Sequence, residues 1–225
     1  GNKKKFSGLV SANPFQGKAL IEGPIKKFRE GEGSSSFIFT AKQSYIDKTS
    51  PFLYDYAVNS NLYQPPLSDS TAAGLTVDEL PFSFTDLYGK LSFTTGNGSK
   101  FNVFGFNFND RVKYQGISDL SWDQWGVGAN WTLVPPGSPV LVGGKLAFSD
   151  YQISLAEEDL DERKSRINGW NLGFDFKYFI GENELKYGVE VAGFTTDFSF
   201  FNSVGREITQ RENTTELSGY LDFTI

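Results

Sequence analysis

The stretch INGWNLGFDFKYFIGENELKYGVEVAGFTTDF, residues 167–198, decides the fold class. Every second position in its first half is large and apolar or aromatic, and the pattern resumes after a turn at 181–183. The residues in this repeat are Trp170, Leu172, Phe174, Phe176, Tyr178, Leu185, Tyr187, Val189 and Val191. Because successive side chains of a β-strand point to opposite faces, a period of two predicts two strands joined by a tight turn.

The length of this alternation favours a membrane hairpin. The first run covers nine residues, 170–178, and the residues between its apolar members are small or charged. A strand that crosses a bilayer needs about 9–11 residues, with one face toward lipid and the other toward a polar lumen. A soluble sandwich also alternates, but its strands seldom exceed about 10 residues.

The composition excludes several kinds of chemistry. The 225 residues contain neither cysteine nor histidine, which removes disulfides, zinc–thiolate sites and Ser-His-Asp or Cys-His catalysis. The net charge of −6 argues against a nucleic-acid partner, because such partners bind basic surfaces. We therefore expect no enzyme, no cofactor and no metal centre.

Similar alternation along the chain predicts about ten strands. We expect one all-β domain over residues 1–225, an antiparallel transmembrane β-barrel or a segment of one. Long outer loops are expected at 43–80, 111–118, 155–166 and 200–207, and short periplasmic turns near 97, 137 and 182. One class of connection at each end is typical of outer-membrane barrels, and with ten strands both termini lie on the short-turn side.

The aromatic residues of the strands are expected to face lipid. Trp residues that flank small aliphatic residues are typical of the aromatic girdles at the two membrane surfaces. The lipid-facing or girdle candidates are Trp125, Trp131, Trp170, Phe174, Tyr178 and Tyr187.

Charged residues on the other side of the same strands are expected to line a lumen. The candidates are Asp175, Lys177, Lys186, Glu190 and Lys145. They either contact a solute or a plug domain, or pair with one another so that their charges are satisfied inside the barrel. The sequence leaves both interpretations open.

The segment 43–80 is long, irregular and rich in proline, which is typical of an extracellular loop. Five aromatic residues in it are candidates to contact a ligand or partner: Tyr45, Phe52, Tyr54, Tyr56 and Tyr63. The alternative is that they pack the loop against itself and the barrel rim. The acidic run 157–162 lacks the spacing of an EF-hand and is expected to be a solvated loop.

Four short segments lie within roughly the first 90 residues: Phe6-Ser7-Gly8, Ile21 to Ile25, Ser36 to Asp47 and Leu80 to Leu91. In sequence and order they resemble the barrel of Bacteroidetes-type TonB-dependent outer-membrane receptors. The resemblance implies the first barrel strands after a plug domain, in a barrel of about 22 strands. It also implies partners: the lipid bilayer, the plug and remaining strands, the TonB system and a surface lipoprotein.

The sequence departs from that family because it contains no plug, no TonB box and about half the strands. No apolar segment follows Gly1–Lys5 as a signal peptide would require, so we expect a processed or excised piece. The expected function is part of a nutrient-uptake receptor in the bacterial outer membrane, without chemistry of its own. The alternatives are a complete small pore or adhesion barrel, or a soluble β-sandwich that binds a ligand through loop 43–80.

Overall fold

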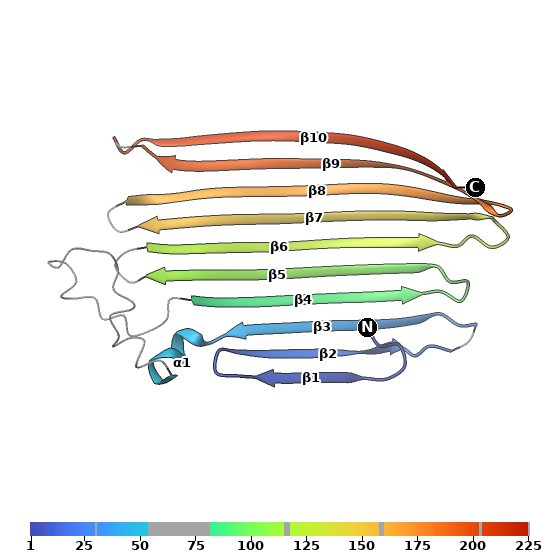
Figure 1. Cartoon of the computed structure of the whole chain (residues 1–225), viewed down its shortest axis with the longest axis horizontal. Helices are drawn as coiled ribbons and strands as arrows, with labels where there is room; N and C mark the ends of the chain where they lie inside the picture. Colours follow the sequence, from blue (N-terminus) through green and yellow to red (C-terminus); the bar gives the residue numbers. More distant parts are fainter. Residues whose placement is uncertain (30, 54–81, 115–117, 158–159, 203, 225) are drawn as a thin grey trace.

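Ten strands form one antiparallel sheet, in which each strand pairs with its neighbours in the sequence (Figure 1). The computed structural model describes residues 1–29, 31–53, 82–114, 118–157, 160–202 and 204–224. The strands are β1 (Ser7–Ala12), β2 (Gln16–Lys26), β3 (Ser34–Ser44), β4 (Phe82–Thr94), β5 (Lys100–Tyr114), β6 (Ser118–Leu133), β7 (Val140–Glu157), β8 (Leu160–Ile180), β9 (Asn183–Phe201) and β10 (Glu207–Thr224).

The sheet is open, with β1 and β10 at its two edges. A barrel closed by these ten strands, which the sequence allowed, is therefore not what the chain forms. A sandwich would need a second sheet over Trp170 and Phe174, but the described strands form one sheet and both rings are exposed. No hydrophobic residue in the described part of the chain is buried, so this sheet has no core of its own.

We call the face of the sheet that carries Trp131 and Phe174 the band face, and the face that carries Asp175 and Lys145 the opposite face. The register of β6, β7 and β8 places these two pairs of residues on different faces. One end of the sheet carries α1 (Ile46–Leu53), and the other carries the hairpin connections 95–99, 134–139 and 181–182 (Figure 1). We call them the α1 end and the hairpin end. β1 begins and β10 ends at the hairpin end, as expected for ten strands.

Two of the four long loops expected from the sequence are wrong, because β5 and β6 extend into 111–118 and β7 and β8 extend into 155–166. The loop expected at 200–207 is present but shorter, since β9 ends at Phe201 and β10 begins at Glu207. β8 alone has 21 residues. A strand of this length spans about 70 Å at 3.3 Å per residue, more than twice a bilayer's apolar thickness.

The fourth expected loop, 43–80, is partly structured. β3 continues to Ser44, and α1 begins two residues later. The remainder of this segment, from residue 54 to 81, lies outside the described residues. No helix in the described part of the chain is long and apolar enough to cross a membrane.

Glycines allow the tight hairpins. Gly98 and Gly181 have φ values of 89° and 63°, in the left-handed region that side chains disfavour. Gly98 lies in the β4–β5 connection and Gly181 in the β8–β9 connection, near the turns expected at 97 and 182. Pro24 lies beside a register shift between β2 and β3, where proline's missing N–H is tolerated.

Candidate functional site

An apolar band crosses the band face from β2 to β10. On β6 it runs from Trp125 to Leu133, and on β8 from Trp170 to Tyr178. Rings from different strands meet within it: Trp131 of β6 reaches across Gly144 of β7 to Phe174 of β8, with centroids 5.9 Å apart, and the centroids of Trp125 and Phe148 on the adjacent strands β6 and β7 are 5.2 Å apart. These separations suit attractive aromatic pairs.

All six girdle candidates lie on the band face, as their alternation predicted. Trp125 and Trp170 lie at the edge of the band toward the α1 end, whereas Tyr178 lies at its edge toward the hairpin end. Phe174 lies midway along the β8 part of the band, and Tyr187 stacks on Phe176 with centroids 5.0 Å apart. The two ends of the band on β8 are therefore aromatic.

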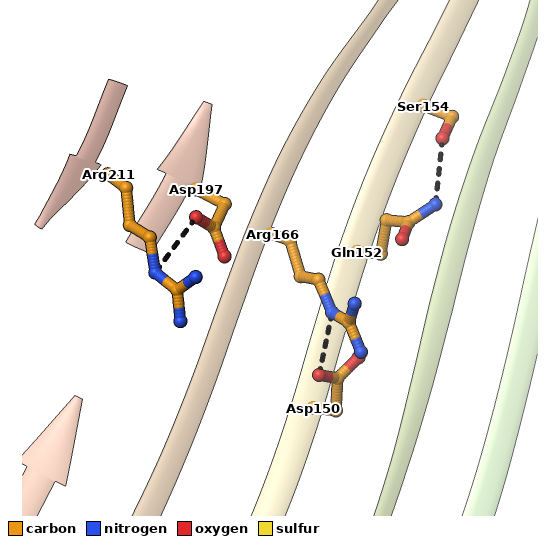
Figure 2. Close-up of polar contacts among 6 residues, drawn as sticks. All are labelled: Asp150, Gln152, Ser154, Arg166, Asp197 and Arg211. Atoms are coloured by element: carbon orange, nitrogen blue, oxygen red, sulfur yellow. Dashed lines mark hydrogen bonds and ion pairs between the residues drawn. The ribbon is translucent and has the colours of Figure 1, made fainter. Parts of the chain in front are cut away.

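Polar residues replace the band directly toward the α1 end. Figure 2 shows two ion pairs of this region. Arg166 on β8 donates to Asp150 on β7 at 2.8 Å, and Arg211 on β10 lies 3.5 Å from Asp197 on β9. Asp150 is only 5% exposed and lies beside Trp125 in the register. The band face thus changes from apolar to ion-paired between adjacent residue rows.

A third ion pair beyond the band joins the tips of β5 and β6. Arg111 donates two hydrogen bonds to the Asp119 carboxylate. These bonds hold the pKa of Asp119 below its usual value and raise the pKa of Arg111. Both groups lie between the band and the α1 end.

The structure brings the five lumen candidates together on the opposite face. Lys145 on β7 and Glu190 on β9 form an ion pair of 2.8 Å across β8. The Asp175 carboxylate lies over Gly143, where an added Cβ would overlap it. The mutual pairing that the sequence left open is therefore present for Lys145 and Glu190.

The remaining two lumen candidates share a partner that sequence reasoning missed. Glu184 lies 2.5 Å from Lys177 and 2.8 Å from Lys186. It follows the β8–β9 turn and lies on the same face as both lysines. The sequence could have indicated this partner, because Glu184, Lys186 and Glu190 are all even-numbered residues of one strand and therefore lie on the same face.

The opposite face also carries an aromatic patch near the α1 end that sequence reasoning did not assign to a site. Phe106 and Phe108 stack at 4.9 Å, and Phe198 and Phe200 lie 5.3 Å apart. The register places Trp122 between these two pairs, on β6. Nearby, burial and Asp86 raise the pKa of Asp110, which the register places beside Trp122.

Of the five loop candidates, only Tyr45 has a described side chain. Tyr45 accepts a backbone hydrogen bond from Thr49, and its hydroxyl donates to the carbonyls of Asn13 and Gln16, so it fastens the start of α1 to the β1–β2 turn. This is the packing role expected as the alternative to ligand contact. Phe52 belongs to α1 but its side chain is outside the described part, as are residues Tyr54, Tyr56 and Tyr63 entirely.

The described residues of the acidic run, 157 and 160–162, belong to strands rather than to a loop. Glu157 ends β7 and pairs with Arg163 of β8, while Glu162 lies 2.7 Å from Lys164. Residues 158 and 159 lie outside the described set. Within the described set, no three His, Cys, Asp or Glu residues are grouped as a metal site.

A hollow of about 340 Å³ lies among β7, β8, β9 and β10. Its lining combines small residues, hydroxyls, two carboxylates and aromatic rings: Ala147, Ser149, Gly169, Trp170, Asn171, Glu190, Ala192, Phe194, Glu216 and Ser218. All but Trp170 belong to the opposite face by register. This hollow therefore combines open space with polar side chains on the opposite face.

Comparison with known proteins adds no relative. No protein-family model matches the sequence, and no curated protein matches it either.

Proposed function

We propose that the chain forms part of the wall of an outer-membrane β-barrel of the TonB-dependent receptor type, through which a nutrient passes. The observation that carries the proposal is a ten-stranded sheet with a continuous apolar band on one face and no buried hydrophobic residue in the described part. Exposed apolar surface of this extent marks contact with lipid or another apolar surface.

The position of the band supports lipid as that partner. The hydrogen-bonded register connects Ala41, at the band edge on β3, through each strand to Asn213 on β10. The apolar residues of β10 on the band face begin at Leu217, four residues further along. At the other edge, the register connects Phe37 to Leu217, and the band on β10 ends six residues beyond, at Phe223.

These offsets correspond to an oblique crossing of the strands. A drift of four to six residues is about 13–20 Å along the strands, over seven strand spacings that total about 34 Å. The band therefore runs about 20–30° from the hydrogen-bonded rows. Strands of membrane barrels cross the bilayer obliquely, at about 35–45°, so a flat apolar layer across this sheet drifts in the same manner.

The charged opposite face supports a lumen on the other side. The ion pairs of Lys145 with Glu190 and of Glu184 with Lys177 and Lys186 lie behind the apolar band. Lumen walls of transmembrane barrels are polar, whereas charges at the same depth on the lipid side are costly. In this proposal the open edges at β1 and β10 pair with further strands, and a plug and TonB supply the energy for transport.

Arginine substitutions at adjacent residues test the assignment of the faces. Leu221 lies in the band, and Tyr220 beside it lies on the opposite face; both are more than half exposed. Leu221→Arg should lower the stability of the lipid-reconstituted chain by about 2–4 kcal/mol if it lies at mid-depth, and Tyr220→Arg by less than about 1 kcal/mol. Urea unfolding in lipid vesicles measures both.

Phe174→Arg provides the same test at the centre of the β8 part of the band. Equal effects of Leu221→Arg and Tyr220→Arg, or a chain that stays monomeric and folded in plain buffer, would contradict a lipid-facing band. Flotation of the unmodified chain with vesicles in a density gradient gives an independent reading of membrane association.

A further inference from the structure

β10 leaves one long edge of the sheet open (Figure 1). This strand has 18 residues, all of them exposed, whereas β1 at the other edge has only six. About half of the backbone N–H and C=O groups of an edge strand point away from its single neighbour and are free to pair with another strand. The edge at β10 is therefore a surface for a partner that is itself a β-strand.

Two carboxylates on the opposite face of β10 lack a cationic partner. In the described part of the chain, neither Glu212 nor Glu216 forms an ion pair with a Lys or Arg. Glu212 accepts a hydrogen bond of 2.7 Å from the amide of Gln210, which is uncharged and lies on the same strand. The β9 residues that the register places beside this part of β10 on the same face are also uncharged: Ala192, Phe194 and Thr196. β9 thus supplies no cation, and the side of the two carboxylates that faces away from β9 is still open.

The band face of β10 specifies the remaining side chains of the partner. Its one arginine, Arg211, already lies 3.5 Å from Asp197 of β9. Further along, Leu217, Leu221 and Phe223 are 74%, 75% and 53% exposed. Side chains directly across two paired strands contact one another on the same face of the sheet. A partner with apolar residues at these positions would therefore continue the band.

A second copy of this chain does not supply the missing cations. The residues of β10 on the opposite face, at even positions from 208 to 224, include no Lys or Arg. Those of β1, the other open edge, are Ser7, Leu9 and Ser11. Pairing with either edge strand of another copy, with the band faces aligned, would place only further carboxylates or uncharged groups beside Glu212 and Glu216. The charges therefore favour a different strand as the partner.

We propose that β10 pairs with a further strand of the barrel wall that carries Lys or Arg opposite both Glu212 and Glu216. The partner runs antiparallel to β10, as every neighbouring pair in this sheet does. Its two basic residues lie four positions apart on the opposite face, and its residues across from 217–223 on the band face are apolar. Opposite charges directly across two strands stabilise the pairing, and like charges destabilise it. The inference rests on the proposed function only in placing this strand in the same wall.

Binding of synthetic strands to the full chain in neutral detergent micelles tests the proposal. A basic peptide covers 211–223 in antiparallel register, with Lys opposite Glu212 and Glu216 and Leu opposite the band-face residues from 217 to 223. An acidic peptide has Glu in place of both Lys. Fluorescence anisotropy of a dye on each peptide measures binding at low salt, where the charges are least screened. We expect the basic peptide to bind at least about tenfold more tightly than the acidic one.

A charge swap separates local pairing from general attraction to an acidic chain. The double variant Glu212→Lys, Glu216→Lys should invert the preference, so that the acidic peptide binds more tightly. Glu207→Lys is the matched control, because Glu207 lies on β10 beyond the span of the peptides and should leave the preference for the basic peptide in place. Equal affinities of the two peptides for the unmodified chain, or an uninverted preference in the double variant, would overturn the proposal.

A disulfide locates the partner on the edge. The chain has no cysteine, so Asn213→Cys carries a single thiol. Directly paired residues of antiparallel strands have Cα atoms about 4.5–5.5 Å apart, within reach of a disulfide. We expect a disulfide with a basic peptide whose cysteine lies opposite residue 213, and none with a peptide whose cysteine is displaced by four residues. Disulfides between two Asn213→Cys chains, formed in preference to the peptide disulfide, would identify a second copy as the partner and overturn the proposal.

The outcome is separable from that of the proposed function. A chain that floats with vesicles but does not distinguish the two peptides refutes the basic partner strand and leaves the membrane wall standing. A chain that prefers the basic peptide but stays monomeric and folded in plain buffer refutes the membrane wall alone.

Discussion

Glycines in the sheet make room for large rings on neighbouring strands. Trp131 lies across Gly144, and Trp170 lies across Gly193, so that a Cβ at either glycine would overlap an indole ring. On the opposite face Phe104 and Phe106 cover Gly128 and Gly126 in the same way. Glycine normally weakens a strand, but here the ring of a cross-strand neighbour fills the space its side chain leaves.

Substituting alanine at two band-face glycines tests this arrangement. Gly144→Ala should destabilise the chain by about 1–3 kcal/mol, because the Trp131 ring must move out of its position. Gly89→Ala is the matched control: its added Cβ would be 3.8 Å from the nearest atom, of Phe39, which is ordinary contact. Urea unfolding in detergent should show Gly89→Ala unchanged or slightly stabilised. Equal losses in both variants would contradict the account.

The face of the sheet on which each candidate residue lies could be predicted from the sequence. Period-two alternation assigned all six girdle candidates to one face and all five lumen candidates to the other. The ion pairs were not readable, because they depend on which residues of separate strands lie side by side. Lys145 and Glu190 are 45 positions apart in the sequence and face each other across β8 only through the register of two hairpins.

The lengths of the strands could not be predicted from the alternation of apolar residues. On β7 the apolar residues Leu146 and Phe148 lie on the band face, but Tyr151, Ile153 and Leu155 lie on the opposite face. The alternation continues with its phase shifted by one residue, which moves the apolar set to the other face. A break in phase resembles the end of a strand, which is why the sequence predicts a loop over 155–166 where β7 and β8 continue.

The tips of β5 and β6 should respond to pH through Arg111 and Asp119. The pKa of Asp119 is lowered in the folded chain, so the pair contributes stability that is fully present above the ordinary aspartate pKa of about 3.9 and is lost as pH falls through the lowered value. Amide hydrogen exchange at residues 111–114 and 118–121 should therefore speed up only below about pH 4.

Asp119→Asn removes the titrating group and should abolish this acid-induced increase while raising exchange at neutral pH. Asp197→Asn is a suitable control, because Asp197 pairs with Arg211 between β9 and β10, away from the tips of β5 and β6. An identical acid response in the Asp119→Asn variant would show that the ion pair does not hold the strand tips.

The whole sheet lacks what a self-contained fold needs. A single sheet with both faces exposed buries no hydrophobic residue in its described part, and β10 is exposed along its entire length. In the proposed barrel wall, contacts of lipid with the band and of further strands with β1 and β10 supply the missing stability. Openness could not be read from the sequence, because ten strands with both termini at one end are equally compatible with a closed barrel. Closure depends on curvature and on the shear of the strands, which no local pattern encodes.

Accessibility of spin labels along β8 in lipid vesicles tests the central claim most directly. The chain has no cysteine, so each single-cysteine variant from 170 to 178 carries one label at a known position. The account predicts high oxygen and low nickel-chelate accessibility at 170, 172, 174, 176 and 178, and the reverse at 171, 173, 175 and 177. Position 166, beyond the band, should be open to the nickel chelate. Labels at 170–178 that show no alternation, or that are all open to the aqueous reagent, would contradict a sheet whose apolar band faces lipid.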